Sequence, residues 1–437
     1  MMSITQFTME EVRCFGERQT LEIRPLTFLV GENSTGKTTA LGCFHVLADY
    51  FQRRGIDFNS HPYSMGTFKD IVRNSNKKVK SYKLGYTYNY EDENIEVTVE
   101  FYEKASGFEP IVNSITSNFS DGRIIFEAEA EDEIGRGFRI TSMNEEQNHY
   151  HIYTSSELLN DYPYIFLYHR LQDESELDSA LSNYLKKKSN KSERRGFSPF
   201  DTLQDLSIFS TSPVRSRPKR TYDPTREFND PEGSDVPMYL MRIEATEKKD
   251  WEMLKEQLID FGKSSGLFQN IKINKLGRSL GAPFQLQFKV RGPTSNITDV
   301  GYGISQILPI LVQILNPNMF QRNRRLRIAN FTLLQQPEVH LHPRAQAQFS
   351  SLLVNSASRG KQSFIVETHS DYMIDRARIE IRKGNIKPDD VSLIYFEPVR
   401  NIVRIHNIGF DEMGNPIDVP KHYREFFLKE TDRLMGF

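Results

Sequence analysis

Eight residues near the N-terminus have the types and spacing of a loop that binds nucleotide phosphates. The segment GENSTGKT, Gly31 to Thr38, fits the pattern Gly-x-x-x-x-Gly-Lys-[Ser/Thr]. Its glycines let backbone N–H groups turn inward around phosphate oxygens, and the start of the following helix adds positive partial charge. Lys37 is expected to reach the β- and γ-phosphates, and the Thr38 hydroxyl to bind magnesium. ATP and Mg²⁺ are therefore the expected cofactors. The expected nucleotide contacts are Gly31, Glu32, Asn33, Ser34, Thr35, Gly36, Lys37, Thr38 and Thr39.

Three later segments carry polar groups at the ends of apolar runs. In VGYGISQILPIL, Ser305 follows two glycines at the start of a helix, which suits an anion but is also the pattern of an ordinary capped helix. In FTLLQQPEVHLHP, an apolar run ends in Gln335 and Gln336, and Glu338 follows. In FIVETHSDYM, a second apolar run places His369 at the carboxyl edge of a sheet, where α/β folds bind ligands. A lone histidine there is often structural, so the order of all these segments carries the argument.

Gln335 and Gln336 stand where many ATPases have two acids that hold magnesium and activate water. Glutamine has the shape of glutamate but no charge, and it cannot take a proton as a general base. Loss of a general base typically lowers a rate by about 10²–10⁴-fold. Three interpretations remain open: a natural variant in which Glu338 or a water substitutes, a laboratory Glu-to-Gln substitution, and a sensor that binds nucleotide but turns it over slowly. The candidate catalytic residues are Gln335, Gln336, His369 and Glu338, and the candidate metal ligands are Thr38 and Gln335.

The elements that must position these segments alternate at both ends of the chain. A compact apolar run, Leu26 to Val30, precedes the phosphate loop, and buried strands alternate with helices after about residue 285. Between them lie segments in which polar and apolar residues alternate, as in strands, followed by polar segments with helical spacing. We expect an α/β fold with a mostly parallel core sheet, an antiparallel β lobe and an inserted helical lobe. The expected segments are 1–75 (first part of the core), 76–150 (β lobe), 151–284 (helical and loop insertion) and 285–437 (second part of the core).

The composition excludes several classes of protein. The 437 residues carry a formal net charge of -2, so no global field draws the chain to nucleic acid or membrane. Cys14 and Cys43 are too few for a disulfide framework. The N-terminus lacks the pattern of a signal peptide, and the longest apolar stretch, Ile304 to Leu315, is too short to cross a bilayer. We expect a cytoplasmic protein without membrane contact.

In this order, the segments resemble the motifs of ABC-type P-loop ATPase heads, in particular the RecF/SMC/OLD branch (OLD, overcoming lysogenization defect). GENSTGKT is similar to the Walker A loop, GYGISQ to the signature motif, LLQQPEVHLHP to Walker B and the D-loop, and VETHS to the switch-histidine motif. SMGTFKDIV lies where the family has its Q-loop. The segment SPVRSRPKRTY and the tail IDVPKHYREFFLKETDRL resemble those of small single-chain bacterial defence-type members without a Toprim nuclease domain. The resemblance covers roughly residues 1–75 and 285–437.

The resemblance implies a head-to-tail nucleotide sandwich. Ser305 would touch the γ-phosphate held by a second copy of the chain, and His369 would face the γ-phosphate. With one copy of each motif, the chain would need a homodimer or a larger homo-oligomer to complete a site. The resemblance also implies a switch or sensor that controls a partner effector, such as a nuclease, in bacterial anti-phage defence. The alternatives are a RecF-like ATPase that binds DNA for repair or maintenance, and a hydrolysis-dead nucleotide-binding scaffold.

Three basic clusters bear on DNA binding. They are Leu185–Arg195, Arg215–Arg220 and Gln321–Arg327. Each is most simply a solvated surface. The functional alternative is a track for the phosphate backbone of DNA that only an assembled dimer makes continuous. The cluster at Arg215–Arg220 has a further alternative, contact with nucleotide or with the neighbouring subunit.

Overall fold

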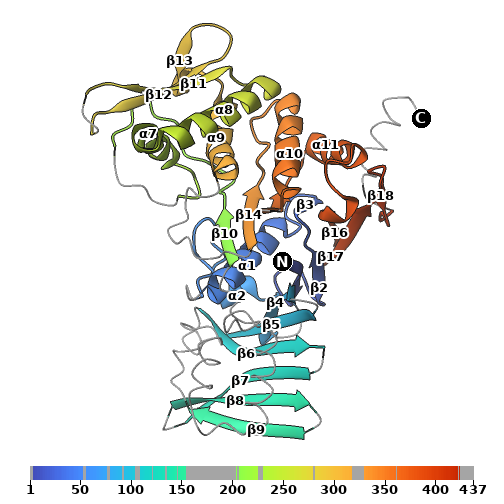
Figure 1. Cartoon of the computed structure of the whole chain (residues 1–437). Helices are drawn as coiled ribbons and strands as arrows, with labels where there is room; N and C mark the ends of the chain where they lie inside the picture. Colours follow the sequence, from blue (N-terminus) through green and yellow to red (C-terminus); the bar gives the residue numbers. More distant parts are fainter. Residues whose placement is uncertain are drawn as a thin grey trace, which may run out of the picture.

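The central element of the fold is a seven-stranded sheet that is parallel over most of its width. In the computed structural model, its strand order is β10-β14-β15-β3-β16-β17-β18 (Figure 1). The strands are β10 (Leu206–Ser210), β14 (Ala329–Gln335), β15 (Ser363–Glu367), β3 (Leu26–Gly31), β16 (Val391–Val399), β17 (Ile402–Phe410) and β18 (Pro416–Ile417). The first five are parallel to one another, and β17 and β18 are antiparallel additions at one edge. The expected mostly parallel core sheet is confirmed.

The structure describes most of the chain. The described residues are 3–52, 56–75, 79–90, 93–103, 109–120, 122–132, 135–144, 146–153, 203, 206–224, 230–278, 281–316, 329–360, 362–421 and 423. The basic clusters Leu185–Arg195 and Gln321–Arg327, and the C-terminal tail beyond residue 423, lie outside them.

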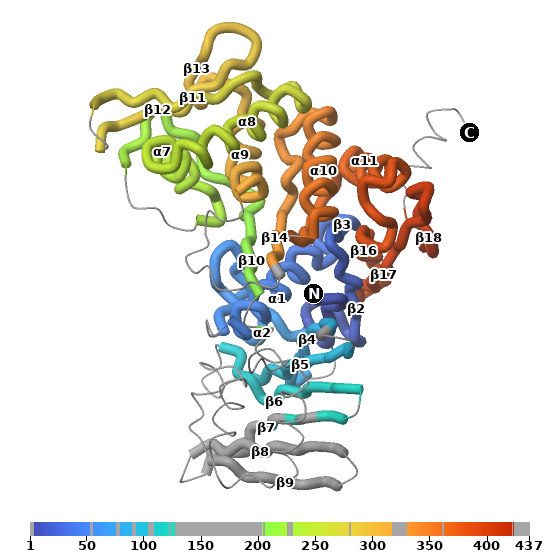
Figure 2. The backbone as a smooth tube through the Cα atoms, in the orientation of Figure 1, coloured from blue at the N-terminus to red at the C-terminus, as the bar shows by residue number. Residues whose placement is uncertain are grey.

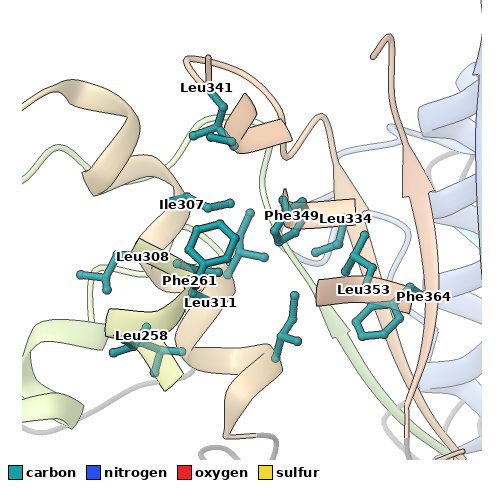
Figure 3. Close-up of a cluster of buried hydrophobic side chains, with 14 of the residues drawn as sticks. Leu258, Phe261, Ile307, Leu308, Leu311, Leu334, Leu341, Phe349, Leu353 and Phe364 are labelled. Atoms are coloured by element: carbon teal, nitrogen blue, oxygen red, sulfur yellow. The ribbon is translucent and has the colours of Figure 1, made fainter. Parts of the chain in front are cut away.

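Helices cover both faces of the central sheet, and alternate residues of each strand point into two separate cores. On β14, Leu333 packs into the core that holds α1, whereas Leu334 packs into the core on the other face. Figure 3 shows this second core, with Leu258 and Phe261 of α8 and Phe349 of α10 around the sheet residues. The helices are α1 (Lys37–Phe51) on the first face, and α8 (Lys248–Ser265), α9 (Tyr302–Leu315), α10 (Pro343–Ala357) and α11 (Asp371–Arg382) on the second.

An antiparallel sheet of eight strands forms a lobe on one side of the core, as expected. Its order is β2-β1-β4-β5-β6-β7-β8-β9 (Figure 1). The strands are β1 (Ser3–Glu10), β2 (Gln19–Glu22), β4 (Ser81–Tyr90), β5 (Glu93–Glu103), β6 (Pro110–Phe119), β7 (Gly122–Asp132), β8 (Gly135–Asn144) and β9 (Glu146–Tyr153). Because β1 pairs directly with β4, the boundary expected at residue 75 falls between two strands of one sheet. The short helix α2 (Phe68–Ile71) lies on the connection between them.

A second lobe lies at the opposite end of the molecule (Figure 1). It combines helices with a small antiparallel sheet, so it is less purely helical than expected. Its members are α7 (Val236–Thr246), α8, β11 (Asn270–Lys275), β12 (Phe284–Lys289) and β13 (Thr294–Asn296). Two 3₁₀ turns complete the described elements, η1 (Ile297–Asp299) and η2 (Pro388–Asp390).

One strand of the expected insertion belongs to the core. Figure 2 shows β10, in green, beside β14, in orange, and the two pair in parallel from Leu206–Ala329 to Ser210–Leu333. The burial of β10 alternates along its five residues, as in a strand with one face on the α1 core. The segment 151–284 therefore supplies an edge strand to the core sheet as well as a lobe. No helix of the described residues has the length and apolar character needed to span a membrane.

Candidate nucleotide-binding site

The phosphate loop joins the buried strand β3 to helix α1, which is the context that the motif requires. Gly31 and Gly36 have φ angles of 145° and 88°, in the region that favours glycine. A Cβ on Gly36 would lie 2.7 Å from Cys14 Sγ and from the Phe15 ring, so a side chain there would also clash. The Thr35 hydroxyl donates to the Glu32 carbonyl oxygen at 2.8 Å and closes the loop. The backbone therefore has the tight turn needed to direct its N–H groups at an anion.

Lys37 lies folded against this loop. Its Nζ donates to the Gly31 carbonyl at 3.0 Å and to the Glu32 carbonyl at 2.6 Å. The residue is only 3% exposed, and burial lowers its pKa, while the Glu367 and Glu32 carboxylates oppose that shift. Gly31 and Glu32 thus position the lysine through their carbonyl groups.

A cavity of about 400 Å³ opens beside the loop. It falls within the range of about 300–1,000 Å³ that is typical of small-molecule sites. Its walls come from four places in the chain: the loop with the first turn of α1, the turn after β14, the end of β15, and the segment after β1. The lining residues are Arg13, Cys14, Asn33, Ser34, Thr35, Gly36, Lys37, Thr38, Thr39, Gln336 and Glu367.

The ends of β14 and β15 place one glutamine and one acid at this cavity. Gln336 lines it, with its backbone N–H donating to the Glu367 carbonyl at 2.9 Å and a left-handed φ of 43°. Gln335 is buried, does not line the cavity, and lies near the Tyr63 hydroxyl. The two glutamines therefore occupy different environments, and only Gln336 faces the nucleotide side.

Glu367 is a site residue that the sequence analysis did not single out. The Thr38 hydroxyl lies 3.1 and 2.9 Å from its two carboxylate oxygens and donates to them. Glu367 is 4% exposed, and burial raises its pKa, with the Thr38 hydrogen bond and Lys37 acting in the opposite direction. Its only sequence signal is an acid at the end of an apolar run, two residues before His369.

Arg13 is a second unanticipated residue. Its guanidinium donates to the Thr39 hydroxyl at 3.0 Å, to the Met65 carbonyl at 2.7 Å and to the Asp70 carbonyl at 3.1 Å. It thus joins the start of α1 to the segment Ser64–Val72, which was expected to act as a Q-loop. An isolated arginine after a strand has no motif that identifies it from sequence.

Glu338 and Arg215 support the loops behind the cavity. Glu338 is buried, and its Oε1 accepts a hydrogen bond from the His369 backbone N–H at 2.7 Å. Arg215 is 2% exposed, and its Nη2 donates to the carbonyls of Gln335 and Gln336 at 3.1 and 3.4 Å. Burial lowers the pKa of Arg215 to about 10, with Glu338 opposing the shift. Arg215 and Glu338 therefore hold the turn after β14 and the loop after β15 in place.

His369 follows β15 at the carboxyl edge of the sheet and is exposed. Burial of part of its ring and the charge on Lys37 both lower its pKa. His369 is absent from the lining of the phosphate-loop cavity, and its switch role stays a prediction.

Ser305 lies outside the cavity of the phosphate loop. It is on the first turn of α9, 6% exposed, and its hydroxyl donates to the Tyr302 carbonyl at 2.8 Å. It lines a different cavity, of about 370 Å³, together with Arg217 and Lys219. A Cβ on Gly303 would lie 2.6 Å from the His340 carbonyl oxygen, so a glycine is needed for α9 to begin against the turn after β14.

The residues of the cavity fit a magnesium–nucleotide complex. Thr38, Gln336 and Glu367 offer oxygen ligands, which are those that Mg²⁺ prefers. Within the described ranges, no three His, Cys, Asp or Glu side chains form a metal cage. Mg²⁺ commonly needs no such cage, because phosphates and water supply most of its ligands. Bound Mg²⁺ would neutralise phosphate charge.

Known proteins that are similar to this chain include solved structures and one protein family. Among solved structures, it is similar to an SMC head bound to the C-winged-helix domain of ScpA, with 12% identity, 94% and 98% of the two chains covered, and a TM-score of 0.45. It is also similar to the SMC head domain from Thermotoga maritima (11% identity, 95% and 99% covered, TM-score 0.39) and to an SMC head from Pyrococcus furiosus (13%, 100% and 100%, 0.45). No curated protein matches the chain. The model of the AAA ATPase domain family (AAA_15) matches residues 2–374, and the chain belongs to that family.

Proposed function

We propose that this ATPase-family chain is a nucleotide-controlled switch that closes as a head-to-tail homodimer around ATP and Mg²⁺. In this proposal, the loop Gly31–Thr39 of one copy binds the phosphates, and Ser305 of a second copy completes the site. The observation that carries the proposal is the separation of the two cavities. The cavity at Lys37 and the cavity at Ser305 share no lining residue, so the two residues do not contribute to one cavity within a single chain.

Slow turnover is part of the proposal. The residue of the Walker B pair that faces the cavity is Gln336, which has no proton-accepting carboxylate. Without a general base at this position, we expect hydrolysis about 10²–10⁴-fold below that of a version with glutamate. Long-lived ATP then favours a clamp over a motor. His369 and Glu338 stay candidate residues for the reaction, His369 beside the γ-phosphate and Glu338 behind the loop.

The closed dimer would act on a partner protein. An effector such as a nuclease, and a setting in bacterial anti-phage defence, follow from the resemblance of the motifs alone. The test is to express the neighbouring gene product with this chain and to measure its activity with ATP present and absent. ATP-independent activity would argue against control by the switch.

Two substitutions test the nucleotide and dimer steps separately. Lys37→Ala removes the cation of the phosphate loop and should abolish binding of a fluorescent ATP analogue. Ser305→Arg puts a bulky cation on the first turn of α9 and should leave analogue binding intact while abolishing ATP-dependent dimers in light scattering. Lys69→Ala and Ser358→Arg are matched controls, because both residues are exposed and line neither cavity. ATP-dependent dimers of Ser305→Arg would refute the sandwich, and full partner control by Lys37→Ala would favour the hydrolysis-dead scaffold.

The RecF-like alternative draws on the basic cluster Arg215–Arg220. Within it, Arg215 is buried and Arg220 pairs with Asp299, so Arg217 and Lys219 are the cations that face the Ser305 cavity. Direct DNA binding by the isolated chain, steeply dependent on salt and lost when Lys186–Lys188 are reversed in charge, would support this alternative.

A further inference from the structure

We propose that Glu367 supplies the carboxylate of the magnesium site, in place of the acids that are absent at Gln335 and Gln336. The inference deepens the proposed function, since it rests on ATP and Mg²⁺ binding beside Lys37. It assigns the metal-positioning role to the end of β15 rather than to the end of β14.

The order of strands places Glu367 nearer to the phosphate loop than either glutamine. β15 lies between β14 and β3, with Glu367 paired to Gln335 on one side and to Leu29 on the other. A side chain at the end of β15 is therefore one strand from the phosphate loop, whereas one at the end of β14 is two strands away. Neighbouring strands in a sheet are about 4.7–4.9 Å apart, so the backbone of Glu367 is closer to the loop by about that distance.

The hydrogen bond between Thr38 and Glu367 is the direct evidence for this role. The Thr38 hydroxyl donates its proton to the carboxylate, at 2.9 Å from Oε2. Its oxygen lone pairs thus remain free for a metal ion. Mg²⁺ keeps several of its waters in nucleotide sites, and the lone pairs of a carboxylate accept hydrogen bonds from such waters. Glu367 can in this way orient both a protein ligand of the ion and its hydration shell.

No other acid competes for the position among the described residues. Glu367 is the one carboxylate that lines the cavity. Glu338, the acid nearest in sequence to the glutamines, does not line it and accepts the His369 N–H instead. Gln336 offers a neutral amide at the rim, which can bind water but brings no charge.

Burial makes the carboxylate costly in the absence of a cation. Glu367 is 4% exposed, and the Thr38 hydroxyl donates a hydrogen bond to it. Its neighbouring cation is Lys37, whose Nζ already donates to two carbonyl groups. An ionised group in such a place is stabilised by a divalent ion. A purely structural residue at this position would be better as glutamine, which keeps the acceptor for Thr38 without a buried charge.

The test measures metal-dependent nucleotide affinity, with no turnover involved. The affinity for a non-hydrolysable fluorescent ATP analogue is measured in EDTA and across a titration of Mg²⁺, for the wild type and for Glu367→Gln. The variant keeps the shape and the acceptor oxygen of Glu367 and removes a negative charge beside the phosphates, so the analogue should bind in EDTA at least as tightly as it binds the wild type. The Mg²⁺ concentration at half-effect should rise about 10–100-fold, as for other residues that orient metal ligands. Glu380→Gln is the matched control and should titrate like the wild type, because Glu380 is a buried acid of α11 that lines neither cavity.

Each further result either supports or overturns the assignment. Glu367→Asp keeps the charge and should recover part of the Mg²⁺ effect, whereas a merely structural residue would be rescued better by glutamine. An unchanged Mg²⁺ midpoint in Glu367→Gln would overturn the proposal, even with binding intact. A different result would show that the proposed function itself is wrong: in EDTA, Lys37→Ala would bind the analogue as tightly as the wild type does. If Glu367→Gln does not fold, Glu367→Asp tests the same point, because aspartate keeps the charge but is one methylene shorter. A Mg²⁺ midpoint above that of the wild type supports the assignment, and a midpoint equal to that of the wild type overturns it.

Discussion

Replacing Arg215 with methionine should destabilise the protein by about 3 kcal/mol. The guanidinium Nη2 donates to the carbonyls of Gln335 and Gln336, and a hydrogen bond from a charged donor contributes about 1.5–3 kcal/mol. The two hydrogen bonds together therefore contribute about 3–6 kcal/mol. Burial raises the pKa of Glu338 and Arg215 opposes this rise, so removing the arginine also leaves that carboxylate less stabilised. Methionine fills a similar volume, so the apolar packing of the long side chain is largely kept, which places the expected loss at the lower end.

A double-mutant cycle separates the two contributions. In Arg215→Met, part of the loss comes from the unpaired charge of Glu338, and Glu338→Gln removes that charge while keeping an acceptor for the His369 N–H. The double variant should therefore be more stable than the sum of the two single losses predicts, by about 1–2 kcal/mol, within the range for residues of one polar network. The assay is urea unfolding followed by circular dichroism and by the fluorescence of Trp251, the single tryptophan, which is buried in α8.

The matched control is Arg217→Met. Arg217 lies two residues away, is exposed, and contacts neither glutamine, so its urea midpoint should match that of the wild type within the small effects usual for surface changes. If the urea midpoint of Arg215→Met equals that of the control, Arg215 does not stabilise the turn after β14. Strict additivity in the cycle would refute the electrostatic coupling to Glu338.

Three more predictions follow from single contacts. Gln336→Glu adds a proton acceptor at the cavity and should raise ATP turnover by about 10²–10⁴-fold; an unchanged phosphate-release rate would exclude position 336 as the limiting group. Gly303→Ala places a Cβ 2.6 Å from the His340 carbonyl and should cost about 1–3 kcal/mol in urea unfolding, whereas Gly301→Ala meets nothing within 4 Å and should cost much less. The third prediction concerns pH. Burial raises the pKa of Glu367 in the folded protein above its ordinary value of 4.5. Above pH 4.5, the folded nucleotide-free protein therefore binds more protons than the unfolded chain does. Its stability should fall through that window, and melting temperatures of Glu367→Gln should show a shallower fall; equal slopes would contradict the shift.

Several features of the site could be predicted from sequence because they are local. The phosphate loop is one contiguous segment, and its glycines, lysine and threonine act through the backbone turn that they themselves form. The apolar runs that end at Gln335 and just before His369 are the strands β14 and β15, and such runs depend on neighbours a few residues away. The mostly parallel sheet and the antiparallel lobe followed from the order of these patterns and are confirmed.

Other features depend on which strands become neighbours, and no local pattern contains that information. Glu367 meets Thr38 across 329 positions of sequence because β15 inserts between β14 and β3. A crossover that skips one strand leaves the same apolar runs in the sequence as one that does not. For the same reason β10, inside the expected insertion, was not recognised as an edge strand of the core sheet.

The two glutamines show most clearly which properties of the site come from the sequence and which come from the tertiary structure. The sequence by itself determined that this chain has a phosphate-binding loop and that two uncharged residues end its Walker B strand. Only the tertiary structure decided that one glutamine is buried while the other lines the cavity, and that an acid from the adjacent strand contacts the loop threonine. The physical reason is that charge and hydrogen-bonding capacity belong to residue types, whereas the distances over which they act are set by strand order and packing.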